Sequence, residues 1–377
     1  MDASSQSTSM SPQPINVGHN GTSVLDHATS TATTGTTTGT ATTTTAGLPA
    51  SAGPVNRDDP VPQLVWLVFG ATGHLGRSVS GIALARNDFV IHVGKTGADE
   101  QNPPPSNPNS FFTLCDVRER ESVSKAVDVA LNVWGRIDVV VNCAGYGIIG
   151  ACEDQDEYEI RNQMDTNFMG LFNIMHLTIP YFRKRREGRY IVFSSTSGFL
   201  GLPGLGGYCG SKWAAEGFVE SLMYELEPSN IKVSLVIAGL AKRDEPTQDT
   251  HGQIPNWAHF LITAPSPAYS GVTSPANHAK RMVQWIQDKQ ITSGLKVAEM
   301  VWELAHCQNP PLRLLLGQHA VESMRDRLRF TLEEIEDWKH LYNLDDSDIQ
   351  NQNDGQDDGG EMEDVVMSTR EEDDDSK

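Results

Sequence analysis

The sequence predicts an α/β protein built on a single Rossmann-type, doubly wound parallel sheet with helices on both faces. Two observations predict this fold. From residue 61 onward, short apolar runs alternate with amphipathic stretches, which is the βαβ pattern of a parallel sheet covered by helices. The first apolar run, 64–69, also leads directly into a glycine-rich turn and a helical stretch, as phosphate-binding turns in such sheets do.

The expected elements follow one another in a regular rhythm, and six or seven strands complete one sheet. The segment 96–110 contains four prolines, so we expect a loop in place of the helix that normally covers this edge. The expected strands are 64–69, 89–93, 111–114, 137–141, 190–194 and 231–237. The expected helices are 75–86, 121–134, 157–186 and 208–227.

Composition divides the chain into one folded domain, 63–343, between two disordered tails. Residues 1–62 are rich in Ser, Thr, Gly and Pro and nearly free of large apolar side chains, so they cannot offset the entropy of ordering. Residues 344–377 form an acidic tail. Its 14 Asp and Glu residues stand against Arg370 and Lys377, and they supply most of the net charge of −20.

Composition also narrows the function classes. No apolar run approaches the roughly 20 residues of a membrane span, and the N-terminus lacks the features of a signal peptide. An acidic chain without a basic stripe argues against nucleic acid as a partner. The 5 cysteines are odd in number and match no zinc pattern, and the histidines form no metal-binding cluster. We therefore expect a cytoplasmic protein with reduced thiols and no metal.

The glycine-rich turn at 70–76 is the candidate phosphate-binding site. Its glycines meet three needs: a tight turn, close approach of the backbone to a pyrophosphate, and close packing of helix on strand. The N–H groups that begin the next helix would hold phosphate oxygens. We expect this turn to bind a dinucleotide. The residues concerned are Gly70, Thr72, Gly73, His74, Leu75 and Gly76.

The end of the second strand indicates which dinucleotide binds. A carboxylate at this point holds the ribose hydroxyls of NAD(H) and repels an added phosphate. The sequence has Lys95 there and no acidic residue at the strand end. Because a cation favours the 2′-phosphate, we expect NADP(H) as the preferred cofactor, with NAD(H) as the alternative.

Tyr208 and Lys212 are the candidate catalytic pair. Four residues apart on a helix, they share a face, so the ammonium can sit near the phenol oxygen. One unit charge about 4 Å away at an effective dielectric near 20 is worth roughly 4 kcal/mol, enough to lower the phenol pKa by about three units. Ser195 directly follows the strand 190–194. Its hydroxyl either hydrogen-bonds the substrate oxygen that Tyr208 would contact or has a structural role in the turn.

In this order, these motifs make residues 63–241 resemble the short-chain dehydrogenase/reductase family, with a looser continuation to about residue 341. The segments 134–138 and 201–204 look like the branch that includes steroid- and retinol-type dehydrogenases. The resemblance is also carried by motifs not yet mentioned. These are Asp116-Val117, Asn142-Cys143-Ala144-Gly145 and Asn167.

The resemblance implies a role for each matching residue. Tyr208 would act as general acid in reduction and base in oxidation, and Ser195 would bind the carbonyl oxygen. Lys212 would hold the nicotinamide ribose and lower the pKa of Tyr208, and Asn167 would support a water relay to Lys212. The remaining matches would bind the cofactor. Asp116 would contact the adenine, and Asn142, Ala144 and Gly145 would line the floor of the cofactor site. They are Asp116, Val117, Asn142, Ala144 and Gly145.

Two departures from the family pattern keep alternatives open. His74 stands where the short form usually has glycine, and the resulting glycine spacing is closer to the extended form that acts on nucleotide sugars. Ala238-Gly239 stands where Pro-Gly is expected, which alters the grip on the nicotinamide amide. We expect an NADP(H)-dependent carbonyl reductase or alcohol dehydrogenase. The alternatives are a nucleotide-sugar enzyme and a redox-inactive NADP(H)-binding sensor or scaffold.

The segment 243–276 corresponds to the substrate lid of the family. It is rich in Pro, Ser, Thr and aromatic residues and has little periodicity. Its aromatic side chains favour a small lipophilic ketone, aldehyde or secondary alcohol as substrate. Relatives dimerise through helices equivalent to 157–186 and 208–227, so the resemblance implies a homodimer or homotetramer.

Overall fold

A sheet of seven parallel strands organises the part of the chain that the structure describes, residues 48–54, 61–97, 99–100, 103–239, 241–242, 259–289 and 292–341. Its order is β3-β2-β1-β4-β6-β7-β11, so strand addition reverses direction between β1 and β4. This confirms the predicted fold class, and ligands bind such sheets beyond the carboxyl ends of the strands at the reversal. The strands are β1 (Val65–Phe69), β2 (Phe89–Gly94), β3 (Ser110–Leu114), β4 (Val139–Asn142), β6 (Gly188–Ser194), β7 (Ile231–Ala238) and β11 (Arg313–Leu316).

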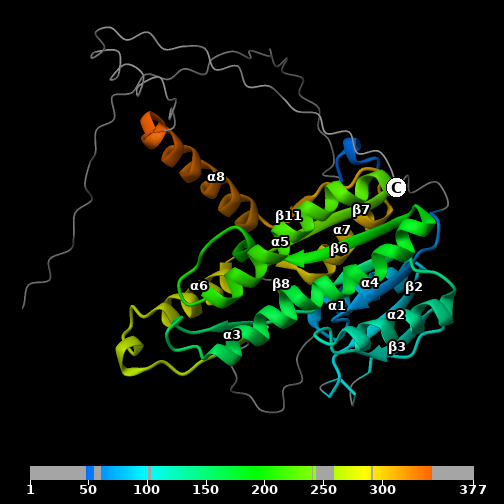
Figure 1. The fold of residues 1–377 in the computed structure, drawn as a ribbon, viewed down its shortest axis with the longest axis horizontal. Helices are drawn as coiled ribbons and strands as arrows, with labels where there is room; N and C mark the ends of the chain where they lie inside the picture. The colour runs from blue at the N-terminus through cyan, green and yellow to red at the C-terminus, as the bar shows by residue number, and fades with distance from the viewer. Residues whose placement is uncertain are drawn as a thin grey trace, which may run out of the picture. The chain divides into compact units, whose positions relative to one another are not determined.

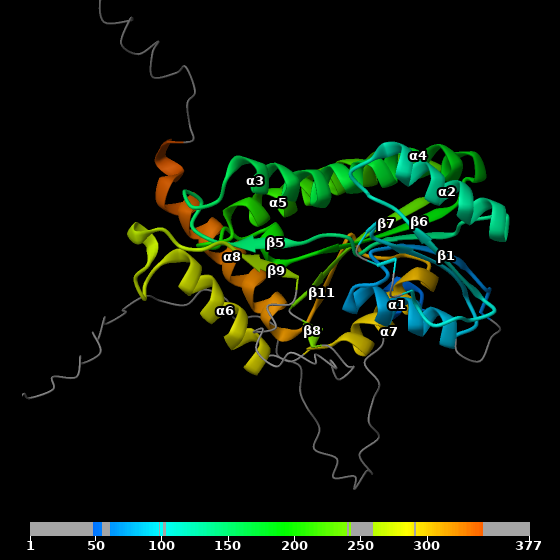
Figure 2. The ribbon, with the colours of Figure 1, turned by 90° about the horizontal axis from the view of Figure 1, so that it is seen from below.

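Helices cover both faces of this sheet (Figures 1 and 2). Strand β1 shows why both faces need cover: Leu67 and Phe69 belong to one apolar core, whereas Trp66 and Val68 belong to the other. The first core is shared with α2 (Arg120–Trp134), α4 (Gly170–Arg185) and α5 (Gly206–Leu226). The second is shared with α1 (His74–Ala85) and α7 (Gly294–His306).

The helix expected over 157–186 is interrupted at its centre. It consists of α3 (Glu157–Met164), a π-helical turn (Asp165–Met169) and α4. Such single π turns occur often at functional sites, because they rotate a side chain away from the regular helical position. Here the turn contains Asn167.

Several elements after β7 have no counterpart in the prediction. Two of them matter for the site: β9 (Phe260–Ile262) pairs in parallel with the short strand β5 (Gly147–Ile149), and α6 (Pro275–Lys289) follows. Strand β11 and helix α8 (Gln318–Trp338) complete the domain, and the short strands β8 (Ala241–Lys242) and β10 (Thr292–Ser293) pair with each other. Of the predicted lid, 243–258 lies outside the described residues.

Part of the segment predicted to be disordered is ordered. Within 1–62, residues 48–54 include a short 3-10 helix (Ala50–Ala52), and the Ala52 side chain is buried. The carbonyls of Ala52 and Gly53 accept hydrogen bonds from the backbone of Asn309 and Gln308, at 2.9 and 3.1 Å. The physical reason is a local one: Leu48 and Ala52 pack on the core beneath α7. Residues 1–47 and 342–377 lie outside the described part of the chain.

Two features are absent from the described residues. Among their helices, none combines the length and apolar character needed to cross a bilayer. Among their side chains, no group of three or more His, Cys, Asp or Glu lies together as a metal site would require.

Candidate active site

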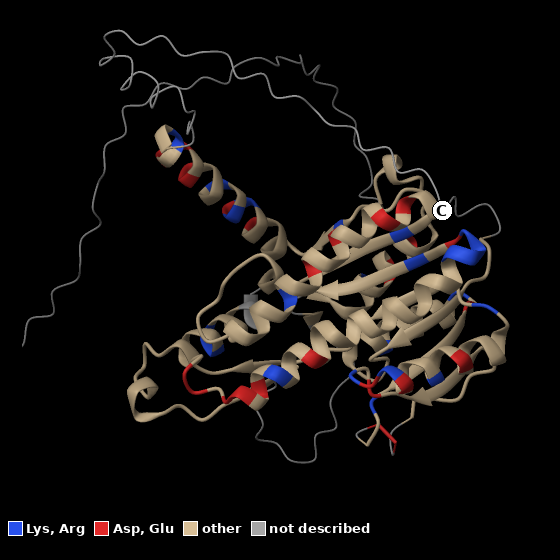
Figure 3. Ribbon diagram, viewed as in Figure 1, with Lys and Arg blue, Asp and Glu red and all other residues tan. Residues whose placement is uncertain are grey.

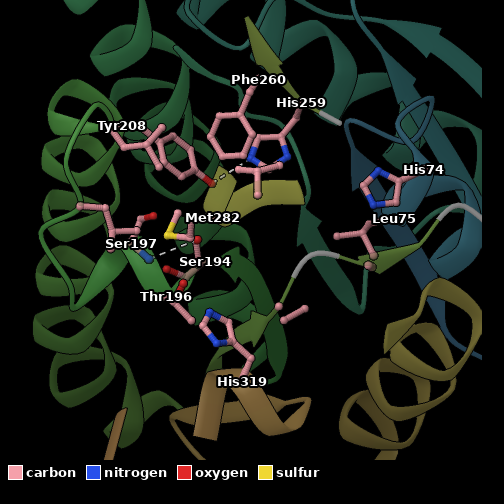
Figure 4. A pocket seen from close by; sticks show the side chains of 17 residues that line it. His74, Leu75, Ser194, Thr196, Ser197, Tyr208, His259, Phe260, Met282 and His319 are labelled. Carbon is pink, nitrogen blue, oxygen red and sulfur yellow. Dashed lines mark hydrogen bonds between the residues drawn. The ribbon is translucent and has the colours of Figure 1, made fainter. Parts of the chain in front are cut away.

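A small cavity opens at the carboxyl ends of β6 and β7, close to the reversal of the sheet (Figure 4). Its volume is about 70 Å³, well below the several hundred Å³ typical of sites for drug-sized ligands. The start of α1, the end of β6, the helices α5, α6 and α8, and residues 259–260 all contribute to its walls. The predicted turn and the predicted catalytic helix therefore face one space. Residues singled out from the sequence that line it are His74, Leu75, Ser195, Tyr208, Ala238 and Gly239.

Tyr208 lies on the first turns of α5 and is almost fully buried. Its hydroxyl hydrogen-bonds Nε2 of His259 at 3.0 Å. Burial raises the pKa of Tyr208 above its usual value, and the nearby hydroxyl of Ser195 opposes that shift. The phenol is therefore held in its protonated form, as a proton donor.

Lys212 lies one turn after Tyr208 on α5 and is also buried. Its Nζ donates to the carbonyl oxygen of Phe193 at 3.0 Å and lies 5.8 Å from the centre of the Tyr208 ring. Burial lowers the pKa of Lys212 to about 8, while the carboxylate of Glu216 acts in the opposite direction. The pKa of Tyr208 lies above its usual value and not below it, because burial disfavours the phenolate.

Glu216 is a buried carboxylate that sequence reasoning missed. It lies one further turn along α5, accepts a hydrogen bond from the hydroxyl of Ser194 at 2.6 Å, and pairs with Nε of Arg313 at 3.2 Å. These contacts tie the helix to the ends of β6 and β11. Because a negative charge nearby stabilises an ammonium, Glu216 also helps to keep Lys212 protonated.

Asn167 connects α5 with the turn that follows β4. Its Nδ2 donates to the carbonyl of Tyr146 at 2.8 Å and to the hydroxyl of Ser211 at 2.9 Å, while its Oδ1 accepts from the N–H of Tyr146 at 3.0 Å. A Cβ placed on Gly145 would lie 2.9 Å from this Oδ1 and 3.7 Å from Nζ of Lys212. Oδ1 of Asn167 and Nζ of Lys212 therefore both lie close to Gly145.

Each of the three glycines of the turn, Gly70, Gly73 and Gly76, meets one of the three expected needs. Gly70 has a φ of +73°, and a Cβ there would lie 2.7 Å from the N atom of Ala144. A Cβ on Gly76 would lie 2.2 Å from the carbonyl oxygen of Gly70, so this glycine is needed for helix-on-strand packing. A Cβ on Gly73 would find nothing closer than 3.4 Å, so the space above it is open to a phosphate. The turn thus fits a pyrophosphate.

A carboxylate that the sequence did not reveal reaches the end of β2. Oδ2 of Asp99 accepts hydrogen bonds from the backbone N–H of Lys95 and from the hydroxyl of Thr72, both at 2.6 Å. On the other side of the turn, Nε of Arg77 donates to the carbonyl of Thr72 at 2.7 Å. Charges of both signs therefore lie near the end of β2: Lys95 and Arg77, and the carboxylates of Asp99 and Asp116.

The other predicted cofactor residues gather at the ends of β3 and β4. Oδ1 of Asn142 accepts from the N–H of Ala144 at 3.1 Å, which holds the turn that follows β4. Asp116 follows β3 and is paired with the guanidinium of Arg118, which lowers the pKa of Asp116. Val117 is buried, and its side chain packs where a Cβ on Gly170 would lie.

His259 is the main residue of the cavity that sequence reasoning missed. It precedes β9, and its carbonyl accepts from the N–H of Gly147 at 3.1 Å. Burial lowers the pKa of His259 to about 3, so its imidazole is neutral near pH 7. A lone histidine in a segment without periodicity carries no signal in one sequence. Only the pairing of β9 with β5 brings it over Tyr208.

Comparisons with known proteins agree with this geometry. The family model for short chain dehydrogenases matches residues 64–251. The chain is 30% identical to an uncharacterised oxidoreductase of Schizosaccharomyces pombe over 274 residues, 72% of this chain and 87% of that protein. It is 36% identical to a 3-ketodihydrosphingosine reductase of Bacteroides thetaiotaomicron over 178 residues, 47% of this chain and 64% of that relative's length.

A solved structure of a short-chain dehydrogenase from Streptomyces avermitilis matches with a TM-score of 0.65 at 27% identity, covering 74% of this chain and 98% of that one. The sheet, the turn and the buried tyrosine and lysine together define a Rossmann-fold oxidoreductase. The chain belongs to the short-chain dehydrogenase/reductase family, and it is a dehydrogenase/reductase enzyme.

Proposed function

We propose that the protein is an NADP(H)-dependent carbonyl reductase or alcohol dehydrogenase that acts on a lipophilic ketone, aldehyde or secondary alcohol. The observation that carries the proposal is the hydroxyl of Tyr208, which lies in the cavity with the hydroxyl of Ser195 beside it and Lys212 behind it. Apolar side chains of Leu202, Leu205 and Met282 also line the cavity and would suit a lipophilic substrate.

In this mechanism a bound nicotinamide supplies or accepts the hydride, and the side chains of the chain handle the proton. In reduction, the Tyr208 hydroxyl donates its hydrogen to the substrate oxygen, and Ser195 donates a second hydrogen bond to the same atom. The ammonium of Lys212 stabilises the phenolate that forms. Asn167 keeps the cofactor floor at Gly145 in register with α5 and with Lys212.

The remaining cofactor contacts follow the turn and the strand ends. The pyrophosphate would lie over Gly73 at the start of α1, with Asp116 at the adenine. Lys95 and Arg77 support a 2′-phosphate, whereas the carboxylate of Asp99 supports a free ribose hydroxyl. Because Lys95 stands at the strand end where NAD(H)-binding sheets have a carboxylate, NADP(H) is the preferred cofactor. Lys95→Glu should then lower the affinity for NADPH more than that for NADH.

The described part of the predicted lid covers the reacting end of the cavity. The imidazole of His259 occupies the side of the Tyr208 hydroxyl that a substrate oxygen would approach. We propose that 243–276 serves as the substrate lid and that substrate binding replaces this hydrogen bond.

Titration of NADPH fluorescence, followed by NADPH consumption with a panel of ketones, aldehydes and quinones, tests the proposal. Turnover that Tyr208→Phe abolishes, with NADPH still bound, is the expected result. Binding of NADPH without turnover of any carbonyl would instead favour the second candidate, a redox-inactive sensor or scaffold, which the covered Tyr208 hydroxyl also fits. Turnover restricted to a nucleotide-sugar panel would support the extended-type alternative.

Assembly and location are further parts of the proposal. Exposed apolar side chains on α5, such as Trp213 and Tyr224, support a homodimer or homotetramer through α4 and α5. All five cysteines, Cys115, Cys143, Cys152, Cys209 and Cys307, are free thiols, which supports a cytoplasmic location.

A further inference from the structure

Helix α8 presents an exposed apolar stripe. The structure describes all of its residues, and among them only Ala320 is buried. Leu328, Leu332 and Ile335 follow one another at the spacing that places side chains on one helical face, and Trp338 extends the same face. Their exposed fractions are 56%, 63%, 43% and 58%. Single exposed apolar residues are ordinary, but a continuous stripe of four indicates an interaction surface.

The described part of the domain leaves this stripe uncovered. Helix α8 begins directly after β11, and its first turns contact β11 and the short helix Thr196–Gly198. Figures 1 and 2 show the remainder of α8 extending away from the central sheet. A shallow groove runs along it, lined by Leu328 and Leu332 together with charged side chains of the same helix.

The charges on α8 are segregated along its length. Three arginines, Arg325, Arg327 and Arg329, lie around its middle beside the acidic Glu322 and Asp326, and its last turns carry Glu333, Glu334, Glu336 and Asp337. Figure 3 shows both signs along the helix. The exposed ion pairs within α8, such as Arg329 with Asp326 at 3.2 Å and with Glu333 at 3.8 Å, are weak and can exchange for pairs with another helix.

This pattern is self-complementary in one orientation. When two copies of α8 lie antiparallel, the arginines at 325–329 of each helix face the acidic residues at 333–337 of the other, and the two apolar stripes meet between them. A parallel pair would set like charges side by side and is disfavoured. At 1.5 Å per residue the helix is about 31 Å long, enough for several turns of contact.

We propose that α8 is a homotypic interface, through which a second copy of this chain docks with its own α8 antiparallel to the first. The two-fold relation makes the same stripe serve both partners. This interface is separate from the one proposed on α4 and α5. An assembly formed through α4 and α5 would therefore double its number of chains when it also pairs through α8.

Two charge-reversed full-length chains test the interface. One variant carries Arg325→Glu, Arg327→Glu and Arg329→Glu, and the other carries Glu333→Lys, Glu334→Lys and Glu336→Lys. Each variant alone should show half the mass of the native chain in sedimentation at micromolar concentration, because like charges then face each other. An equimolar mixture of the two should recover the native mass, since each reversed segment meets a partner of opposite charge.

Controls separate this surface from folding and from the active site. Phe330→Ser changes a residue that is 53% exposed on the opposite side of α8 and should leave the mass unchanged. Circular dichroism of each variant checks that the domain is folded. Equal masses for the native chain, both variants and their mixture would overturn the proposal, as would a native chain that sediments as a single copy. Neither result bears on whether Tyr208 is catalytic.

Discussion

Residues four apart on one helix carry the catalytic proposal, and these were the ones that the sequence could predict. Tyr208 and Lys212 share a face because helical spacing dictates it, and Ser195 meets them because parallel strands end at one edge. The positions of Asp99 and His259 depend on loops that return from elsewhere in the chain, which no local pattern encodes. Asn167 was predicted, but the π turn that orients it was not.

The pH dependence of activity should follow Lys212. Its pKa lies at about 8, so the ammonium is present below that pH and is lost above it. We expect kcat/KM for carbonyl reduction to fall as the pH rises through about 8. In Lys212→Arg the charge persists, so this limb should shift to higher pH even if the maximal rate drops. A limb that stays at the same pH in the variant would assign it to another group.

Removing the imidazole from the Tyr208 hydroxyl should make substrate binding easier. His259→Ala eliminates a hydrogen bond worth about 0.5–1.5 kcal/mol that substrate must displace, so KM for a bulky ketone should fall about two- to tenfold. Because the imidazole of His259 is already neutral, its removal should add no new step to the pH profile of activity between about pH 5 and 9. His319→Ala, which changes another wall of the same cavity, is the matched control. An unchanged KM in His259→Ala would contradict this account.

Elements with a strong hydrophobic period were predicted well, and short or solvated ones were not. Strands β1, β2, β3, β4, β6 and β7 are apolar runs between helical stretches, and their bounds differ from the prediction by only a few residues. Strand β5 has three residues, and its partner β9 lies in a segment with little periodicity. Helices α6 to α8 follow that segment, beyond the last motif that anchored the prediction.

Helix α1 contains a natural pair of glycines for testing the turn. Gly76→Ala would place a Cβ 2.2 Å from the Gly70 carbonyl oxygen, so it should displace the helix from the turn and weaken dinucleotide binding at least tenfold. Gly81→Ala on the same helix meets nothing within 4 Å and should stabilise the protein by about 0.5–1 kcal/mol. NADPH titration and urea unfolding measure the two effects. Equal behaviour of the two variants would show that the close packing at Gly76 is unimportant.

At the scale of the whole molecule, one buried carboxylate joins the two ends of the folded domain. Asp88 accepts hydrogen bonds from the N–H of Leu64 at 2.8 Å and from the indole N–H groups of Trp66 at 3.0 Å and Trp302 at 2.8 Å. It therefore connects β1 with α7, more than two hundred residues later in the chain. Sequence alone predicted a buried first strand but could not reveal this connection.

Asp88→Ala should destabilise the fold strongly, because it leaves three donors without an acceptor, two of them fully buried. At about 1–3 kcal/mol for each unsatisfied group, partly relieved by relaxation, we expect a loss of about 3–5 kcal/mol in the free energy of unfolding. Urea denaturation followed by tryptophan fluorescence measures it. Asp326→Ala, at an exposed position of α8, should change the same quantity by less than about 0.5 kcal/mol. Similar values for both variants would refute the role of Asp88.

The pairing of β5 with β9 connects the binding of the dinucleotide with the binding of the substrate. Residues 142–145, the proposed floor of the cofactor site, lead into β5, and β5 pairs with β9, which follows His259. Main-chain bonds such as Gly147 N–H to the His259 carbonyl are stiff, so a shift of the floor moves the cover with it. Binding of the dinucleotide would thereby move His259 relative to Tyr208 before the substrate binds. The backbone connection would in this way favour binding of the dinucleotide first and of the substrate second.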